Sequence, residues 1–193
     1  MTIAILGLGN MGKGLAKRLD GKADLVLASR SGGTTYAAAV AKADIVVLAL
    51  PYAAALEAAS TLDLSGKIVV DISNPITADY SGLTIGHTTS AAEEIAAVAK
   101  GARVVKAFNT IFAGLFDTPA SATANVPVFV AGNDEAAVAA VSDLASKAGF
   151  AVETIGGLDG ARLVEPVGML NIRLGYGLGK GTSIAPSWLK LAA

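Results

Sequence analysis

Three glycines near the start of the chain have a spacing that suits phosphate binding. The run Gly7-Leu8-Gly9-Asn10-Met11-Gly12 follows an apolar segment, precedes an amphipathic one and fits the pattern G-x-G-x-x-G. In such a turn the first glycine lets the chain leave a strand sharply, the second admits a pyrophosphate, and the third lets the helix pack closely on the strand. Free N–H groups at the helix start then favour phosphate. We expect a dinucleotide-binding turn, with a plain strand-to-helix turn as the alternative.

A second group of polar residues stands where the ribose of a dinucleotide would be recognised. In NAD-binding chains an acidic residue about 20 positions after the glycines bonds the ribose 2′-hydroxyl. Here the segment is Ser29-Arg30-Ser31, and Arg30 follows Gly9 by 21 positions. A guanidinium can fork onto a 2′-phosphate, and the two serine hydroxyls can donate to it. The segment therefore predicts NADP(H) rather than NAD(H); a solvated loop arginine is the alternative.

The alternation of apolar and helical segments predicts how these residues are positioned. Short apolar runs indicate strands, and stretches rich in helix formers lie between them, which is typical of βαβ units. We expect strands at residues 2–6, 24–28, 45–50, 67–72, 103–108, 126–131 and 150–155, and helices at residues 11–19, 36–43, 53–61, 91–99, 135–147 and 162–174. The predicted fold class is α/β: a Rossmann-type, doubly wound, mostly parallel sheet in a single domain over residues 1–193, with a C-terminal helix and a Gly-rich tail.

Several element boundaries have a local physical reason. Ser90, with Glu93 three residues later, predicts a capping box at a helix start. Asp134 can cap the next helix, and Gly149 can end it in the left-handed conformation. Pro166 is expected to start or kink the last helix. Between the second and third strands there is room for only one short helix, so this corner of the fold is shorter than in a full Rossmann half.

The composition excludes several classes of function. The chain is 53% hydrophobic and 16% charged with a net charge of -1, so nothing indicates nucleic acid or an acidic membrane surface as a partner. It has no cysteine and one histidine, His87, which excludes disulfides, thiolate catalysis and a His-rich metal site. We therefore expect no metal. The absence of a signal-peptide pattern and of a spanning apolar run predicts a cytoplasmic protein.

Motifs along nearly the whole chain resemble one family. The segments GLGNMGKGLAKRL, SR, VVLALPY, KIVVDISNP, SAAEEIA, ARVVKAFNTI and VFVAGNDEAA occur in this order. Together they resemble the NADPH:coenzyme F420 (deazaflavin) oxidoreductases, and equally the NADPH-binding domain of the STEAP metalloreductases. The end, LVEPVGMLNIRLGYGLG, is similar to the C-terminus of the deazaflavin enzymes. The chain departs from the family in its short segment after the second strand, and it carries no membrane domain.

The resemblance implies roles for three loops at the carboxyl ends of strands, where ligands of open α/β sheets bind. Leu50-Pro51-Tyr52 would border the middle of the cofactor. Asn74-Pro75 would lie near the nicotinamide ribose, and Ala107-Phe108-Asn109 near the nicotinamide and a second ring. Asn74 and Asn109 could bond ribose or carboxamide groups, although asparagines also cap turns. Because the rings carry out hydride transfer, no catalytic acid or base is named.

The roles of four further residues are open at this point. Lys106, inside an apolar run, either assists a cofactor phosphate or lays its stem over the sheet with its ammonium at the edge. Glu165 either caps the last helix or contacts the second ring. Asp71 is either a base or, as the favoured interpretation, a solvated or capping residue, and Trp188 is either a dimer anchor or a core residue.

The expected function is that of an NADPH-dependent oxidoreductase that transfers hydride between NADP(H) and a flavin (FMN or FAD) or the deazaflavin coenzyme F420. Two alternatives remain: a reductase of a small imine or carbonyl, and a redox-sensing module that binds NADP(H) without turnover. The resemblance implies a homodimer. The identity of the second ring, the direction of hydride flow and the final electron acceptor stay open.

Overall fold

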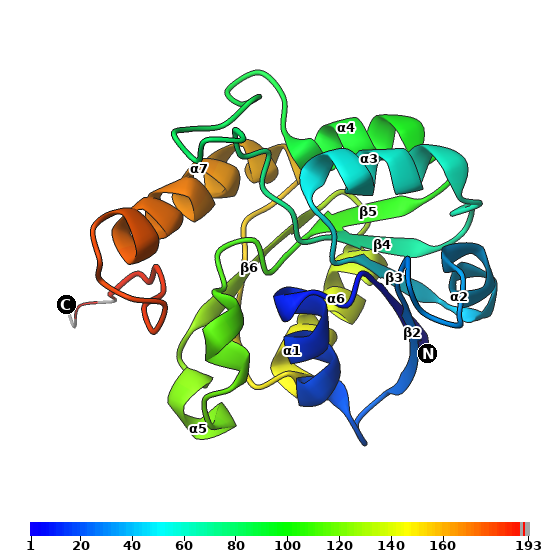
Figure 1. The fold of residues 1–193 in the computed structure, drawn as a ribbon, viewed down its shortest axis with the longest axis horizontal. Coiled ribbons are helices and arrows are strands. Elements are labelled where there is room, and N and C mark those ends of the chain that lie inside the picture. The colour runs from blue at the N-terminus through cyan, green and yellow to red at the C-terminus, as the bar shows by residue number, and fades with distance from the viewer. Residues whose placement is uncertain (190, 192–193) are drawn as a thin grey trace.

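The computed structural model describes residues 1–189 and 191, and its centre is one sheet of seven strands (Figure 1). The strands are β1 (Thr2–Leu6), β2 (Asp24–Ala28), β3 (Ile45–Leu48), β4 (Ile68–Asp71), β5 (Arg103–Lys106), β6 (Pro127–Gly132) and β7 (Ala151–Thr154). They lie in the order β2-β1-β3-β4-β5-β6-β7. All pair in parallel except β5 and β6, which are antiparallel. The predicted α/β fold with a mostly parallel sheet is confirmed.

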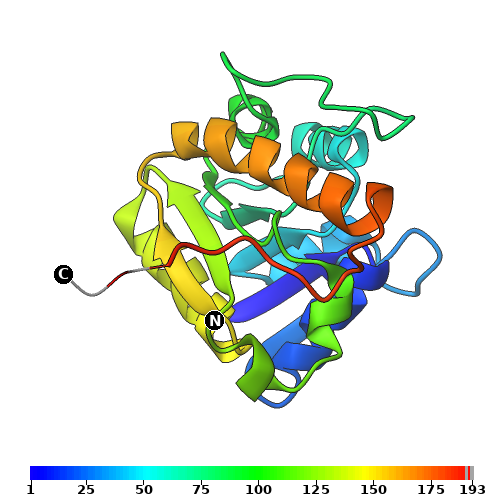
Figure 2. The same cartoon turned by 90° about the vertical axis from the view of Figure 1, so that its left-hand side faces the viewer.

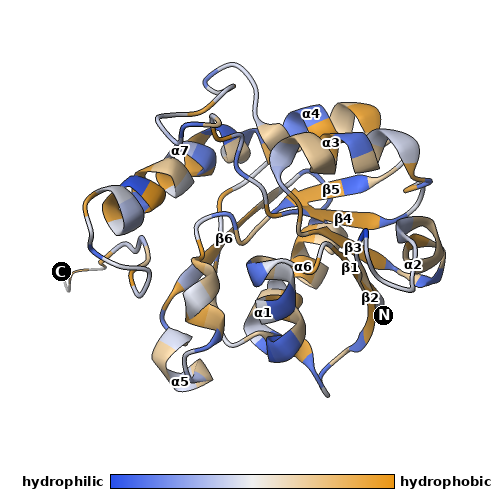
Figure 3. Cartoon of the chain, in the orientation of Figure 1, coloured by the Kyte–Doolittle hydropathy of each residue, from blue (hydrophilic) through white to orange (hydrophobic). Residues whose placement is uncertain are grey.

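Helices cover both faces of the sheet (Figure 1). The longer ones are α1 (Asn10–Leu19), α2 (Tyr36–Lys42), α3 (Tyr52–Thr61), α4 (Ala91–Val98), α6 (Glu135–Lys147) and α7 (Ala161–Ile172). Successive residues of β1 enter different cores: Ile3 and Ile5 pack with α1 and α6, whereas Ala4 and Leu6 pack with α2, α3 and α4. This alternation follows from the period of two in a strand. Both faces of the central strands are therefore apolar, and Figure 3 colours most of these strands in the orange of hydrophobic residues.

The predicted caps are present. Ser90 Oγ accepts a hydrogen bond from the N–H of Glu93 at the start of α4, and Asp134 accepts from the N–H of Ala137 at the start of α6. Gly149 follows α6 with a φ of +87°. The short corner is also confirmed, because α2 has seven residues and the chain then returns to β3 on the other side of β1.

The segment between β5 and β6 contains two elements that the sequence did not predict. A 3-10 turn, η1 (Ala113–Phe116), is followed by the short helix α5 (Ala120–Thr123). The nearly buried Arg18 of α1 holds this segment by donating to the carbonyls of Leu115, Phe116 and Thr118. The contacts join residues about a hundred positions apart, so no local pattern indicates them.

The C-terminal part forms a cover over one end of the sheet. A short turn, η2 (Leu158–Gly160), leads into α7, and a wider π-helical turn, η3 (Arg173–Gly177), follows it. Pro166 lies inside α7, so the expectation that it starts the helix is wrong. Figure 2 shows the tail returning beside α7 toward β6 and β7, where Trp188 packs edge-on against Phe129 with ring centroids 5.4 Å apart. Among the described residues, no helix has the length and apolarity needed to cross a membrane.

Candidate functional site

Two glycines of the first turn are required by close backbone contacts. Gly7 has a φ of +98°, and a Cβ there would lie 2.3 Å from the carbonyl oxygen of Ala49. A Cβ at Gly12 would lie 1.9 Å from the carbonyl oxygen of Gly7. These contacts hold β1, β3 and α1 together at the turn, as the sequence pattern predicts.

Gly9 has a different environment. It is the N-cap residue of α1 with extended backbone and no side-chain cap, and a Cβ there would meet nothing within 4 Å. Asn10 and Met11 follow in the first helical turn, which contains no acidic residue. Leu8, just before, is half-buried against the core. The open helix start, with its free N–H groups, is the arrangement that favours an anion.

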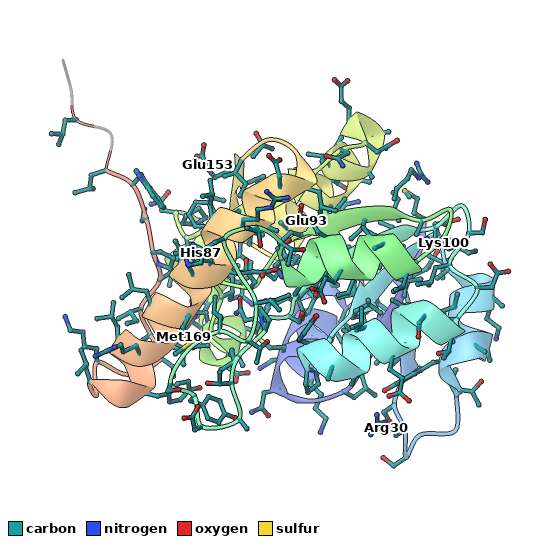
Figure 4. The ribbon with its side chains drawn as sticks, turned by 90° about the horizontal axis from the view of Figure 1, so that it is seen from above. Arg30, His87, Glu93, Lys100, Glu153 and Met169 are labelled. Carbon is teal, nitrogen blue, oxygen red and sulfur yellow. The ribbon has the colours of Figure 1, made fainter. Side chains whose placement is uncertain are left out.

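Arg30, which the sequence predicts to recognise a 2′-phosphate, lies in the exposed turn after β2. Its side chain is 76% exposed, and its nearest anionic partner is Glu57 of α3, at 3.7 Å between Nη2 and Oε2. An exposed pair at this distance contributes little to stability, so the guanidinium is free to turn to a ligand. Ser29 and Ser31 flank it, and the N–H of Gly32 donates to the Ser29 carbonyl. Figure 4 labels Arg30 at the edge of the molecule.

The loop after β3 leads directly into α3. Leu50 is half-buried, with its Cδ2 2.8 Å from the position of a Cβ on Gly7, and Pro51 is the N-cap residue of α3. The Tyr52 hydroxyl donates to Oε2 of Glu94 on α4. Burial raises the pKa of this hydroxyl, and the hydrogen bond to Glu94 adds to the effect. The tyrosine therefore joins α3 to α4, and its hydroxyl stays protonated at neutral pH.

Asn74 and Asn109 lie together, as expected for residues after the neighbouring strands β4 and β5. Asn109 Nδ2 donates to Asn74 Oδ1 at 2.9 Å and to the Val164 carbonyl of α7 at 2.9 Å. Asn74 Nδ2 donates to the Asn109 carbonyl at 2.8 Å. The amide donors are thus used within the protein, which the sequence did not indicate. Asn109 Oδ1 has no partner among the described residues.

The residues beside these asparagines are largely buried. Ala107 and Phe108 are 0% and 1% exposed, and Pro75 is also buried. The Phe108 ring packs edge-on against Phe150, 6.4 Å between centroids. Phe108 has a φ of +59°, a strained conformation for a residue with a side chain. The strain turns the chain sharply after β5, so the ring enters the core and Asn109 faces α7.

Two neighbouring clefts open at this end of the sheet. The smaller, about 260 Å³, lies between the start of α1, the loops after β4 and β5, and α7; its lining includes Asn10, Met11, Asn74, Asn109, Thr110 and Asn171. The larger, about 800 Å³, lies between the loop that contains Asp79, Tyr80 and Ser81 and the end of α7. Ile172 and Tyr176 border both clefts. The arrangement offers adjacent spaces at the carboxyl ends of the strands.

A buried cluster of charges lies behind the clefts. Lys106, Asp71 and Glu165 are 0%, 0% and 1% exposed. The ammonium is 2.7 Å from Asp71 Oδ2 and 2.7 Å from Glu165 Oε1, and it donates to the Ser73 carbonyl at 2.6 Å. Burial raises the pKa of Glu165, and Lys106 opposes that effect.

The contacts within the cluster bear on three residues whose roles the sequence left open. Lys106 is fully buried and its ammonium is held by Asp71, Ser73 and Glu165, so it has no free N–H for a cofactor phosphate. Glu165 caps α4 rather than its own helix, because its carboxylate accepts from the N–H groups of Ala91 and Ala92. Asp71 is a capping residue that accepts from the N–H of Ser73. One signal for this contact was present in the sequence, namely the opposite charges of Asp71 and Lys106 at the ends of two predicted strands. In the structure the two residues are direct partners in the parallel register of β4 and β5.

His87 is exposed, in the loop before α4, with a φ of +60°. It lies outside the charge cluster. No three acidic, His or Cys side chains of the described chain are grouped as a metal site.

Comparison with known proteins identifies the family. The family model described as NADP oxidoreductase coenzyme F420-dependent matches residues 2–75, which include the glycine turn, Arg30 and Asn74. The structure of a candidate F420-dependent NADP reductase from Arthrobacter sp. FB24 has a TM-score of 0.84 and 31% sequence identity, covering 98% of this chain and 100% of that chain. The chain belongs to this family of NADP oxidoreductases.

Two curated relatives agree with this assignment. The F420-dependent NADP reductase of Methanothermobacter thermautotrophicus is 29% identical over 207 residues, covering 90% of this chain and 89% of that protein. Metalloreductase STEAP3 of Rattus norvegicus is 31% identical over 179 residues, covering 86% of this chain and 36% of that protein. This NADP oxidoreductase therefore spans about a third of the metalloreductase and nearly the whole length of the reductase. Both families named from the sequence motifs are confirmed as relatives.

Proposed function

We propose that this oxidoreductase transfers hydride between NADP(H) and a flavin or deazaflavin, with coenzyme F420 the favoured second substrate. The observation that carries the proposal is the pair of adjoining clefts at the carboxyl ends of the strands, one next to the open start of α1 and one beside it under α7. A two-ring reaction needs two such adjoining spaces. The name of the family supports F420 as the second ring.

The first turn and the loop after β2 would hold the dinucleotide. The open face at Gly9 admits a pyrophosphate, and the N–H groups that start α1 would bind it. Arg30, with Ser29 and Ser31, would bind the 2′-phosphate by charged hydrogen bonds. Leu50 and Pro51, beside the turn, would border the middle of the cofactor.

The smaller cleft has the polarity that a nicotinamide and its ribose require. Asn109 Oδ1 and Thr110 Oγ1 are buried without a partner among the described residues, and both residues line the cleft. A carboxamide brings two N–H donors, so it could satisfy buried acceptors that are otherwise costly. Asn74 and Asn109 would act through the fixed position that their mutual hydrogen bonds give them, and Ala107, Phe108 and Pro75 through the backbone turns that they form.

When bound, the two coenzymes supply the hydride donor and acceptor, and the chain supplies alignment. Its residues would hold one ring against α1 and Asn109, and the other against α7. The side chains of Ile172 and Tyr176 border both spaces and would limit the access of water. The buried Lys106 and Glu165 are paired with each other, so we assign no proton transfer to them.

The test is anaerobic oxidation of NADPH by the pure protein, with FMN, FAD, riboflavin and F420 offered separately and NADH as the control donor. We expect turnover with F420 and a clear preference for NADPH. Turnover with a flavin instead would reassign the second substrate. Tight NADPH binding without turnover on any ring would overturn the hydride-transfer proposal and favour a sensor or a reductase of a small imine or carbonyl.

We also propose that the protein is a homodimer. The outward face of α7 carries Leu163 and Leu170, which are 71% and 55% exposed, and Trp188 nearby is 73% exposed. Large apolar side chains grouped on one helix face favour contact with another chain. The cytoplasmic location expected from the sequence stays a prediction.

A further inference from the structure

The two walls of the larger cleft come from distant parts of the sequence. One wall is the loop of residues 76–89, between β4 and α4, which contributes Asp79, Tyr80 and Ser81. The other wall is the end of α7 and the turn after it, which contribute Met169, Arg173 and Tyr176. Figure 4 labels His87, from the first wall, and Met169, from the second. The width of the cleft depends on what holds these two segments.

Both ends of the loop are tied to the buried ammonium of Lys106. Before the loop, the Ser73 carbonyl accepts directly from Lys106 Nζ at 2.6 Å. After the loop, the N–H groups of Ala91 and Ala92 donate to the carboxylate of Glu165 at 3.0 Å and 3.3 Å, and that carboxylate is 2.7 Å from Lys106 Nζ. The loop therefore leaves and re-enters the fold at one charge cluster.

The same carboxylate fixes α7. Glu165 is the residue of α7 that reaches Lys106, and the carbonyl of its neighbour Val164 accepts from Asn109 Nδ2. One turn further along, a Cβ on Gly168 would lie 2.7 Å from Asn74 Oδ1, so the helix rests directly on the asparagine pair. These contacts leave α7 little freedom to shift over the sheet.

The three N–H donors of Lys106 are matched by three acceptors, on Asp71, Ser73 and Glu165. Loss of one partner of a buried, hydrogen-bonded charge leaves the others without compensation, which strongly favours local rearrangement. The glycine turn and the Arg30 loop make none of these contacts. A defect in the cluster should therefore reach the walls of the larger cleft and spare the phosphate-binding end of the dinucleotide site.

We propose that Lys106, Asp71 and Glu165 form a positioning cluster that fixes the loop of residues 76–89 and α7 relative to each other, and so sets the binding of the second substrate without changing the phosphate contacts of NADP(H). The inference rests on the proposed function, because it assigns the larger cleft to that substrate. None of the three residues is assigned a contact with either ring.

The decisive variant is Glu165→Gln. With its amide oxygen in the place of Oε1, the glutamine can still accept from Lys106 and from the N–H of Ala92, but its amide nitrogen must then face the N–H of Ala91, where two donors meet. Glu165→Asp keeps the charge with a shorter reach and serves as the milder variant if Glu165→Gln does not fold. Glu153→Gln, at an exposed acid of β7, is the matched control.

Each variant is compared with the wild type in three measurements: the NADPH dissociation constant by calorimetry, KM and kcat for F420, and amide hydrogen exchange followed by mass spectrometry. For Glu165→Gln we expect an NADPH dissociation constant within about twofold of the wild type, and a KM for F420 raised about tenfold or more. Exchange should accelerate in residues 76–92 and 161–177, while β1 and α1 stay protected. The control should match the wild type in all three measurements.

Exchange that accelerates throughout the chain, or a KM that rises no more than the NADPH dissociation constant does, would overturn the proposal in favour of a general stabilising role. Unchanged exchange in both walls would also overturn it. If the wild type turns over none of the rings, the proposed function fails on that result alone. The exchange pattern then decides whether the cluster fixes the two walls.

Discussion

At the scale of single residues, the three glycines of the first turn separate into two kinds. Gly7 and Gly12 are required by the fold, since a side chain at either position would collide with backbone. Gly9 is not, because nothing of the protein lies near the position of its Cβ and its φ of -72° suits any residue. A requirement for glycine at this position would come from a ligand.

The first prediction follows from this difference. Gly9→Ala should leave the melting temperature within about 2 °C of the wild type, because the added methyl group meets no protein atom. It should weaken NADPH binding about tenfold or more by blocking the approach of the pyrophosphate. Calorimetric titration and thermal unfolding measure the two effects. Gly86→Ala, at another open position, is the control, and equal NADPH affinity in both variants would contradict the assignment of the turn.

The second prediction concerns Arg30. Its side chain is exposed and only loosely paired with Glu57, so Arg30→Ala should not change stability measurably. Loss of a charged hydrogen bond to the 2′-phosphate should cost about 1.5–3 kcal/mol of NADPH binding and leave NADH binding unchanged. The measurement is the ratio of the two dissociation constants. Lys100→Ala removes an exposed cation elsewhere (Figure 4), and an equal change of the ratio in that variant would show a non-specific charge effect.

Sequence patterns located the residues whose roles are local. The glycine pattern, Arg30 and the caps of α4 and α6 are each recognised from residues a few positions away, and all lie where the sequence places them. The hydrogen bond between Asn74 and Asn109 depends on residues 35 positions apart. A single sequence contains the residues of such a contact but not the contact itself.

At the scale of elements, α4 and α7 are joined by an ion pair in addition to the buried cluster. Arg162 of α7 donates to both carboxylate oxygens of Glu93 on α4, at 2.6 Å and 2.8 Å. These bonds lower the pKa of the Glu93 carboxyl below its ordinary value of 4.5. A carboxyl whose pKa is lower in the folded state stabilises the fold above its unfolded pKa and loses this effect as the pH falls.

The third prediction follows from this loss of stabilisation at low pH. Glu93→Gln should lower the melting temperature at pH 7 by about 1–2 °C, because the pair is partly exposed and screened by solvent. The difference from the wild type should shrink as the pH falls below 4.5, because Glu93 then binds a proton more readily in the unfolded chain than in the folded protein. Thermal unfolding from pH 3 to pH 7 measures this difference in melting temperature. A difference that stays constant over this range would show that Glu93 acts through packing and not through its charge.

The same distinction between local and distant contacts explains which elements the sequence predicts. Strands and long helices follow from apolar runs and caps, and they were placed within a few residues. Strand β5 ends at Lys106 and not at Phe108, because the positive φ of Phe108 breaks the strand. The turn η1 and helix α5 are held by Arg18 from the first helix, and the antiparallel direction of β6 follows from this extra segment.

At the scale of the whole molecule, the outer face of α7 is an apolar surface that the fold leaves uncovered. Leu163 and Leu170 are seven residues apart, two helical turns on one face, and both are mostly exposed. A helix in a protein of this size usually buries such a stripe. The proposed homodimer would bury it against a second copy.

The fourth prediction tests that contact. The wild type should have the mass of a dimer in light scattering at micromolar concentration, and the double variant Leu163→Glu, Leu170→Glu should have the mass of a monomer, because buried carboxylates in a dimer interface repel each other. Leu27→Glu, on the edge strand β2, is the matched control and should remain dimeric. A monomeric wild type would contradict the proposal, as would a double variant that remains dimeric.

The buried lysine has a consequence for how the chain folds while it is being synthesised. Lys106 and Asp71 belong to strands that leave the ribosome early, whereas Glu165 arrives with the last helix. Until then the ammonium has one of its two carboxylates, and the first turn of α4 lacks its acceptor. The nascent sheet must therefore keep water at this end, and its final desolvation waits until α7 is synthesised.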